Sequence, residues 1–253
     1  MKIIAIIPAR MGSTRFPGKP LAKILGKPMI DHVYSRSKAC KRLDSVYIAT
    51  PDKKIRDYCK KSNMDVIMTS HKHKRASDRA AEAMLKIEKE TGQRIDIVVM
   101  IQGDEPMIAP SMIDKALKPL IKDRKILITN LMAPIESRQE QDDPNQVKVV
   151  VDKSNFVLYF SREPIPSWKR GAKKVPMYKQ VPIIPFRRNF LLEFNKLIPT
   201  PLEIVESVDM LRIVEHGYRL KMVPVSFGTH AVDTLKDLKM VERIMKSSKK
   251  VRL

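Results

Sequence analysis

Groups that bind phosphate gather in one short stretch near the start of the chain, IIPARMGSTRFPGKPL. It holds three cations, two hydroxyl side chains and two glycines, namely Arg10, Arg15, Lys19, Ser13, Thr14, Gly12 and Gly18. Cations and hydroxyls bond phosphate oxygens directly, and glycines let backbone N–H groups approach an anion closely. The stretch predicts a phosphate-binding loop, although its spacing alone fits a basic surface turn equally well.

The loop matches neither of the two common nucleotide-binding motifs. Five residues separate Gly12 from Gly18, where a Walker A loop has one fewer, and Pro20 stands where that motif has its metal-binding Ser or Thr. The dinucleotide pattern GxGxxG is also missing from the loop, which disfavours a dinucleotide-binding fold.

Two aspartates are candidates for binding a divalent metal. Asp104 lies in VVMIQGDEP, just after an apolar run, where Gly103 permits a turn and Pro106 prevents the strand from continuing. Asp233 lies in HAVDTLKDL, at the start of a helical pattern. Carboxylates at the ends of strands are the oxygen ligands that Mg²⁺ takes. The alternatives are a plain turn aspartate for Asp104 and a helix N-cap for Asp233.

Apolar runs alternate with segments of helical period in the first half of the chain, which predicts βαβ units and a largely parallel sheet. Strands are predicted at Ile3–Ile7, Ser45–Thr50, Asp65–Thr69, Ile95–Ile101 and Ile126–Met132. Helices are predicted at Met29–Cys40, Asp52–Ser62, Ser77–Thr91 and Ser111–Lys122. Loops at the carboxyl ends of parallel strands form the ligand crevice, so the phosphate loop and Asp104 should face each other.

The pattern changes in the second half of the chain. Residues from about 133 to 190 read as β-rich, with a hairpin in VKVVVDKSNFVLYFSR. A helix is predicted from Thr200 to Gly217, then a strand at Lys221–Val225 and a last helix at Asp233–Ser247. We therefore expect a single α/β domain over residues 1–253 that carries an inserted β-rich lobe at about 133–190.

Composition indicates what kind of partner the protein binds and in which compartment it lies. The formal net charge is +21, from 49 Lys and Arg against 28 Asp and Glu, which favours anionic partners without naming one. A basic nucleic-acid-binding module would explain the charge but would leave the phosphate loop and the aspartates without a role. No signal sequence or membrane span is predicted, and the two cysteines form no metal-binding motif. We expect a cytoplasmic protein that does not bind membranes.

Several longer motifs resemble the 3-deoxy-manno-octulosonate (Kdo) cytidylyltransferases, which make CMP-Kdo. They are PARMGSTRFPGKPL, GKPMIDHVY, QGDEP, NQVKVVVD, YFSREPIP, PLEIVES and VDTxxDL, and they run from residue 3 to about 240. The resemblance implies a Rossmann-like nucleotide-diphospho-sugar transferase fold, with helices on both faces of a largely parallel sheet. It also implies that the β-rich lobe pairs two subunits into a homodimer.

The resemblance implies a reaction and roles for particular residues. A hydroxyl of a small acidic acceptor attacks the α-phosphorus of CTP, and pyrophosphate leaves. Mg²⁺ is held by Asp104 and Asp233, and the residues expected to act in catalysis are Lys19, Arg10 and Asp104. The residues expected to bind the nucleotide are Pro8, Ala9, Arg10, Gly12, Ser13, Lys19, Ser77 and Gln102. Only the family likeness names cytosine, so UTP or GTP stays open from the residues themselves.

The segments expected to bind the acceptor depart from the family pattern. HKRASDR stands for HxSGTxR, YKQVPIIPFR for YxHIGIYAYR, and VDMLR for LEQLR. The residues expected to bind the acceptor are Arg75, Arg79, Gln102, Gln180 and Asp209. Because several hydrogen-bonding positions have changed, we expect an acceptor that is smaller, less hydroxylated or more anionic than Kdo. The first candidate acceptor is a modified 3-deoxy-2-ulosonic acid, and the second is a phosphonate. The alternative is a repacked pocket that still accepts Kdo.

Overall fold

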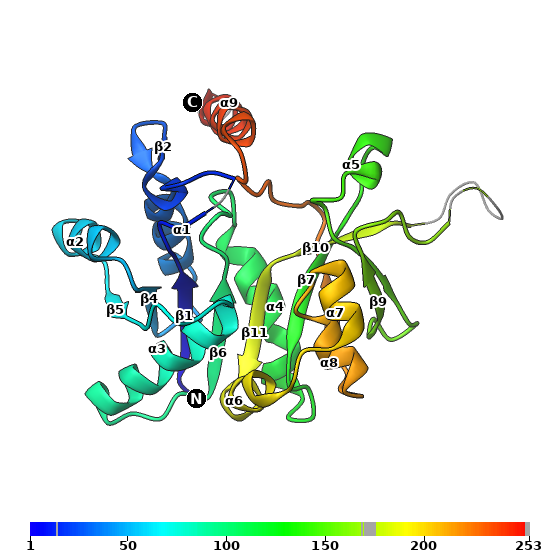
Figure 1. The fold of residues 1–253 in the computed structure, drawn as a ribbon, viewed down its shortest axis with the longest axis horizontal. Helices are drawn as coiled ribbons and strands as arrows, with labels where there is room; N and C mark the ends of the chain where they lie inside the picture. Colours follow the sequence, from blue (N-terminus) through cyan, green and yellow to red (C-terminus); the bar gives the residue numbers. More distant parts are fainter. Residues whose placement is uncertain (14, 168, 170–175, 251–253) are drawn as a thin grey trace. The chain divides into compact units, whose positions relative to one another are not determined.

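The computed structural model describes residues 1–13, 15–167, 169 and 176–250, so Thr14 of the predicted phosphate loop lies outside it. The chain divides into two compact units, one of Met1–Asp114 with Thr229–Leu253 and the other of Lys115–Gly228. The second unit begins earlier and ends later than the β-rich lobe predicted at about 133–190. The strands and helices of each unit are coloured along the chain in Figure 1.

A parallel sheet forms the centre of the first unit. Its strands, in spatial order, are β6 (Ile97–Ile101), β1 (Ile3–Pro8), β4 (Ser45–Thr50) and β5 (Val66–Met68). The central strand β1 is fully buried from Ile4 to Ile7. A strand that is covered on both faces reads as a continuous apolar run, which is the pattern that predicted it.

Helices connect these strands and cover the sheet. They are α1 (Met29–Lys38), α2 (Lys53–Lys61), α3 (Ala76–Thr91) and α9 (Leu235–Lys250), and α4 (Pro110–Lys122) crosses the boundary between the units. From β1 the chain moves outward to β4 and then to β5. It then returns past β1 to form β6 on the other side of β1. Because such crossovers are right-handed, α3 covers the face opposite to α1 and α2. The predicted helices on both faces are confirmed.

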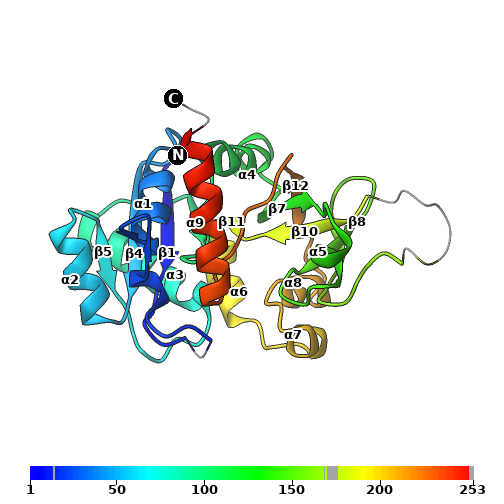
Figure 2. The same ribbon diagram turned by 90° about the horizontal axis from the view of Figure 1, so that it is seen from above.

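The last helix joins the first unit through a small apolar cluster. Val241 and Met245 of α9 pack against Ile24 and Met29, which belong to the short β2–β3 hairpin (Lys23–Ile24 and Lys27–Pro28) and to α1. Figure 2 shows α9 running along this unit. The packing brings the last helix back to the unit that carries the first loop, and Asp233 lies two residues before α9.

The second unit contains a mixed sheet in the order β12, β7, β10, β8, β9. These strands are Lys221–Pro224, Thr129–Pro134, Tyr178–Val181, Lys148–Val151 and Val157–Ser161. The remaining elements are β11 (Ile183–Arg187), α5 (Arg138–Asp142), α6 (Arg188–Lys196), α7 (Pro201–Glu206) and α8 (Leu211–Glu215). Strands β8 and β9 are antiparallel neighbours, which confirms the predicted hairpin.

The helix predicted from Thr200 to Gly217 is two helices in the structure. The start is as predicted, since the Thr200 N–H donates to Oε2 of Glu203 at 3.3 Å. Ser207 then adopts a left-handed conformation with φ 51°, which ends α7 before α8 begins at Leu211. A single helical pattern cannot reveal such a break, because the residues on either side keep helical spacing.

Both cysteines, Cys40 and Cys59, are buried free thiols. Burial raises the pKa of Cys59 to about 12, so this thiol stays protonated and inert. Among the described residues, no helix is both long and apolar enough to cross a lipid bilayer.

Candidate active site

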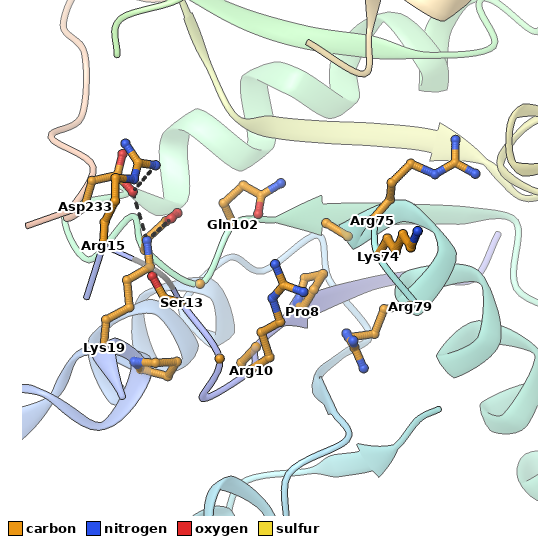
Figure 3. Close-up of a pocket in the computed structure, with 16 residues that line it drawn as sticks. Pro8, Arg10, Ser13, Arg15, Lys19, Lys74, Arg75, Arg79, Gln102 and Asp233 are labelled. Atoms are coloured by element: carbon orange, nitrogen blue, oxygen red, sulfur yellow. Dashed lines mark hydrogen bonds and ion pairs between the residues drawn. The ribbon is translucent and has the colours of Figure 1, made fainter. Parts of the chain in front are cut away.

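A cavity of about 680 Å³ lies in the first unit, at the carboxyl ends of β1 and β6. Its walls come from four segments of the chain: the loop after β1, the first turn of α3 with the residues before it, the turn after β6, and Asp233. The described lining residues are Pro8, Ala9, Arg10, Gly12, Ser13, Arg15, Lys19, Pro20, Lys74, Arg75, Ala76, Arg79, Gln102, Gly103, Asp104 and Asp233. Figure 3 shows these side chains around the cavity.

The loop after β1 is closed by its own backbone. The Gly18 N–H donates to the carbonyl of Met11 at 2.9 Å, and the Met11 N–H donates to Oδ2 of Asp52 at 2.8 Å. Gly18 has φ 75°, a backbone conformation that residues with a Cβ atom rarely adopt. This turn delivers Lys19 to the cavity wall, where it begins a short 3-10 helix, Lys19–Leu21.

Lys19 joins the two candidate metal ligands. Its Nζ lies 2.6 Å from Oδ2 of Asp104 and 3.1 Å from Oδ1 of Asp233. Arg15 adds a second cation, with Nη2 at 3.0 Å from the same Asp233 oxygen. Burial alone lowers the pKa of Lys19, but the two carboxylates raise it above its ordinary value. The ammonium group therefore stays charged between two anions.

Asp104 is placed by the glycine before it. A Cβ on Gly103 would lie 3.0 Å from the carbonyl oxygen of Pro8, so only glycine fits comfortably against the end of β1. The Asp104 carbonyl then accepts the Val232 N–H at 2.9 Å, which ties this turn to the segment that leads into α9. The predicted role of Gly103 in turning the chain is consistent with this contact.

Asp233 is not the N-cap of α9, which was the alternative interpretation of this residue. Asp237 accepts the N–H of Thr234 at 2.8 Å, and the Asp237 N–H donates to the Thr234 hydroxyl at 3.2 Å. These reciprocal bonds form a capping box at the helix start. The Asp233 carboxylate is thereby left to bind Lys19 and Arg15 on the cavity wall.

A second group of cations lies on the other side of Gln102 in the view of Figure 3. Lys74, Arg75 and Arg79 come from the start of α3 and from the segment before it. Arg75 forms a two-point ion pair with Asp78, at 3.1 and 3.0 Å. Burial, together with the nearby charge of Arg10, lowers the pKa of Arg79.

Most predicted nucleotide-binding residues line the cavity, and Ser77 does not. Pro8, Ala9, Arg10, Gly12, Ser13, Lys19 and Gln102 are all in the wall. Ser77, the second residue of α3, is fully buried and is not among the described residues that line the cavity. Its contact with the nucleotide stays a prediction.

Three comparisons with known proteins identify the family. A family model described as cytidylyltransferase matches residues 4–222. A Geobacter metallireducens protein named 3-deoxy-manno-octulosonate cytidylyltransferase is 42% identical over 255 residues, covering 96% of this chain and 98% of that protein. The mitochondrial protein of that name from Arabidopsis thaliana is 39% identical over 247 residues, covering 97% of this chain and 83% of that protein.

The chain belongs to the 3-deoxy-manno-octulosonate cytidylyltransferase family. A solved structure of CMP:2-keto-3-deoxy-manno-octonic acid synthetase in complex with CTP superposes with a TM-score of 0.90 at 36% identity, covering 98% of this chain and 100% of that one. A cytidylyltransferase from Leptospira borgpetersenii, at 19% identity and a TM-score of 0.61, shares the fold. The predicted family, fold class and enzyme class are confirmed.

The five residues expected to bind the acceptor are divided between the two units. Arg75, Arg79 and Gln102 line the cavity of this cytidylyltransferase. Gln180 lies on β10 in the second unit, where its backbone N–H donates to the carbonyl of Val147 at 2.8 Å. Asp209 also belongs to the second unit, in the turn before α8, so contacts of Gln180 and Asp209 with an acceptor remain predictions.

Two charged residues of the cavity wall were not predicted as site residues. The sequence identifies Arg15 as a cation of the first loop. It could not predict the ion pair with Asp233, because the two residues are 218 positions apart. Lys74 belongs to the basic cluster HKHKR, whose position directly before α3 was the one available signal. Local sequence gives charge, but it does not tell which charges share a cavity.

The chemistry of the two carboxylates fits the divalent metal that the sequence predicts. Asp104 and Asp233 already hold one cation together, the ammonium of Lys19, and carboxylate oxygen is the ligand type that Mg²⁺ takes. The described part of the chain contains no cluster of three or more His, Cys, Asp or Glu with metal-site geometry. A metal here would take its remaining ligands from nucleotide oxygens and water, as Mg²⁺ at phosphate sites commonly does.

Proposed function

We propose that this cytidylyltransferase transfers CMP from CTP to 3-deoxy-manno-octulosonate and releases pyrophosphate. The observation that carries the proposal is the Lys19 ammonium bound between Asp104 and Asp233 in a cavity lined by the phosphate loop. Relatives that are named for this acceptor match at 39 to 42% identity over nearly the whole chain. This likeness favours Kdo itself over the smaller acceptor or the phosphonate suggested by the altered segments.

Mg²⁺ is part of the proposal, with Asp104 and Asp233 as its ligands. When bound, the metal supplies charge that lowers the pKa of the attacking hydroxyl and neutralises phosphate oxygens.

The chain's own residues position the reactants. We assign phosphate binding to the backbone N–H groups around Gly12 and to the Ser13 hydroxyl, because both residues line the cavity and Arg10 adds charge on the same wall. We assign to Lys19 the role of offsetting the charge that grows on the pyrophosphate leaving group. Arg79 and Gln102 are offered as groups that hold the acceptor carboxylate, and Arg75, Gln180 and Asp209 as further acceptor contacts.

A homodimer and a cytoplasmic location complete the proposal. The β-rich unit is offered as the dimer interface, which light scattering coupled to size-exclusion chromatography tests directly. The two buried free thiols support a reducing compartment.

Pyrophosphate release with purified protein and Mg²⁺ tests the function. We expect release with CTP and Kdo, and little with UTP or GTP or when the acceptor is omitted. A panel with other 3-deoxy-2-ulosonic acids and with phosphonates tests acceptor choice. If Kdo supports no release while one of these acids does, the acceptor assignment is wrong. If generic duplex nucleic acid binds with a steep salt dependence and CTP does not bind, the enzymatic proposal is wrong.

Two variants link the activity to the cavity. Lys19→Ala and Asp104→Asn should each lower kcat about 100-fold or more, as removal of one group that stabilises the transition state commonly does. Lys23→Ala is the matched control, because Lys23 is an exposed lysine four residues along the same segment. Wild-type turnover by both folded cavity variants would place the reaction elsewhere.

A further inference from the structure

The ammonium group of Lys19 has all of its donors engaged within the protein. An ammonium has three N–H donors. Three oxygens lie around Nζ: Oδ2 of Asp104 at 2.6 Å, the carbonyl of Val232 at 3.1 Å and Oδ1 of Asp233 at 3.1 Å. The side chain is only 15% exposed. In this arrangement no N–H of Lys19 remains for a phosphate oxygen.

The same contacts occupy one oxygen of each carboxylate. Oδ1 of Asp233 accepts from Arg15 as well as from Lys19, and Oδ2 of Asp104 accepts from Lys19. Two cations and two carboxylates sum to a neutral cluster. A divalent cation that approached the nucleotide-free protein would therefore meet carboxylates whose charge is already offset, and it would lie beside an ammonium group that repels it.

Nucleotide phosphates change this balance by offering new acceptors. A lysine has a long flexible stem and carries a point charge, so it can exchange one oxygen partner for another without a change in the backbone. When phosphate oxygens replace the carboxylates around Lys19, Oδ1 of Asp233 keeps its bond from Arg15 and Oδ2 of Asp104 loses its bond from Lys19. That oxygen is then available to a cation, and the phosphates themselves add negative charge beside it.

From this geometry, and resting on the proposed function, we propose that Lys19 is an exchangeable counter-ion of Asp104 and Asp233. In the nucleotide-free chain its ammonium takes the place of the divalent metal, and it transfers to the phosphates as nucleotide and metal enter. Nucleotide and metal therefore bind with positive coupling through the protein. The free enzyme has low affinity for divalent metal by itself.

Mn²⁺ binding to the nucleotide-free protein tests the proposal. Electron paramagnetic resonance measures free Mn²⁺ directly, and the readout needs no turnover. We expect Lys19→Met to bind Mn²⁺ at least ~10-fold more tightly than the wild type, a difference of ~1.4 kcal/mol. Lys23→Met is the matched control, since it removes the same charge from an exposed position nearby, and it should bind like the wild type. Adding Asp104→Asn to Lys19→Met should abolish the gain.

A second measurement uses the wild-type protein alone, so the proposal does not depend on how a variant folds. A non-reactive CTP analogue bound to the wild type should raise its Mn²⁺ affinity above both that of the nucleotide-free protein and that of the analogue in solution. The proposal is overturned if Lys19→Met binds Mn²⁺ no more tightly than Lys23→Met. It is also overturned if the wild type binds Mn²⁺ equally well with and without the analogue.

These outcomes are separable from failure of the proposed function. Pyrophosphate release by the wild type with CTP and Kdo is measured independently. An active wild type whose Lys19→Met variant gains no Mn²⁺ affinity would retain the function and exclude the exchange.

Discussion

Nη1 of Arg79 donates a hydrogen bond to Oγ1 of Thr69 at 2.6 Å, so that α3 holds the segment that leads from β5 to the cavity. The same guanidinium donates to the carbonyls of Ser70 and His73, at 3.2 and 3.4 Å. Glu82, one turn further along α3, accepts the Ser70 N–H at 2.8 Å and a bond from His73. Residues 69–73 are therefore fastened by two side chains of one helix, directly before Lys74 and Arg75 in the cavity wall.

Thr69→Val tests this attachment. The change removes the acceptor of a buried guanidinium N–H, and we expect the free energy of unfolding to fall by ~1–3 kcal/mol. The KM of the substrates should rise more than kcat falls, because the segment that carries Lys74 and Arg75 loses an anchor. Urea unfolding and steady-state kinetics measure both effects. Thr69→Ser keeps the hydroxyl and should behave like the wild type; equal behaviour of the two variants would contradict the prediction.

Acid should weaken the fold through Glu82. Burial by itself raises the pKa of Glu82, but hydrogen bonds from Lys86, the Ser70 N–H and His73 lower it from 4.5 to about 2. Because the folded pKa lies below the unfolded one, the ionised carboxylate stabilises the fold above pH 4.5, and this contribution is lost as the pH falls toward 2.

The measurement is the free energy of unfolding of the wild type and Glu82→Gln as a function of pH. We expect the wild type to be the more stable at neutral pH, and the difference to shrink between pH 4.5 and 2. Glu90→Gln, an exposed change on the same helix, controls for the loss of one negative charge. A Glu82→Gln deficit that stays constant across this range would mean that the carboxylate is not held in its charged form.

Asp233 and Asp237 lie four residues apart and should respond to substitution in opposite ways. Asp233→Asn removes one of the two carboxylates at Lys19, so we expect kcat to fall ~100-fold with the helix intact. Asp237→Ala removes half of the capping box at the start of α9, so we expect a loss of ~1 kcal/mol in stability and a much smaller change in kcat. Thermal unfolding and pyrophosphate release distinguish them. If the two results were reversed, Asp233 would be the helix cap.

The second unit contains a buried ion pair on which its helices depend. Nε of Arg212 lies 2.6 Å from Oε2 of Glu203, and the Arg212 side chain is 1% exposed. Glu203→Gln leaves this guanidinium buried without a counter-charge, so we expect the free energy of unfolding to fall by ~3–5 kcal/mol. Asp142→Asn breaks the exposed pair with Arg138 and should cost less than ~1 kcal/mol. If denaturant titrations gave similar losses in the free energy of unfolding for both variants, the burial of the Arg212–Glu203 pair would not explain its contribution.

Much of the first unit could be predicted from the sequence because its signals are local. The apolar run at Ile3–Ile7 and the helical periods after it give strands and helices that agree with the structure to within a few residues. The ends of elements differ because capping depends on side-chain partners. Met29–Cys40 was expected, and α1 ends at Lys38.

The second unit was harder to delimit, because its boundaries depend on packing. Residues 115–132 and 191–228 belong to the same compact unit as the β-rich segment, although they read as ordinary helices and strands. Strand β12 pairs with β7 in parallel, and these strands lie far apart in the chain. No local pattern reports such a pairing.

The sequence by itself determined the family, the fold class and the residue types of the site, since long ordered motifs and strand-end loops are written in consecutive residues. Only the tertiary structure decided what these groups contact. Lys19 meets Asp104 and Asp233 across separations of 85 and 214 positions, Asp233 is released from capping by Asp237, and Ser77 is fully buried. The reason is physical: charge and hydroxyl chemistry belong to each residue, whereas a contact depends on which distant partner packing brings within about 3 Å.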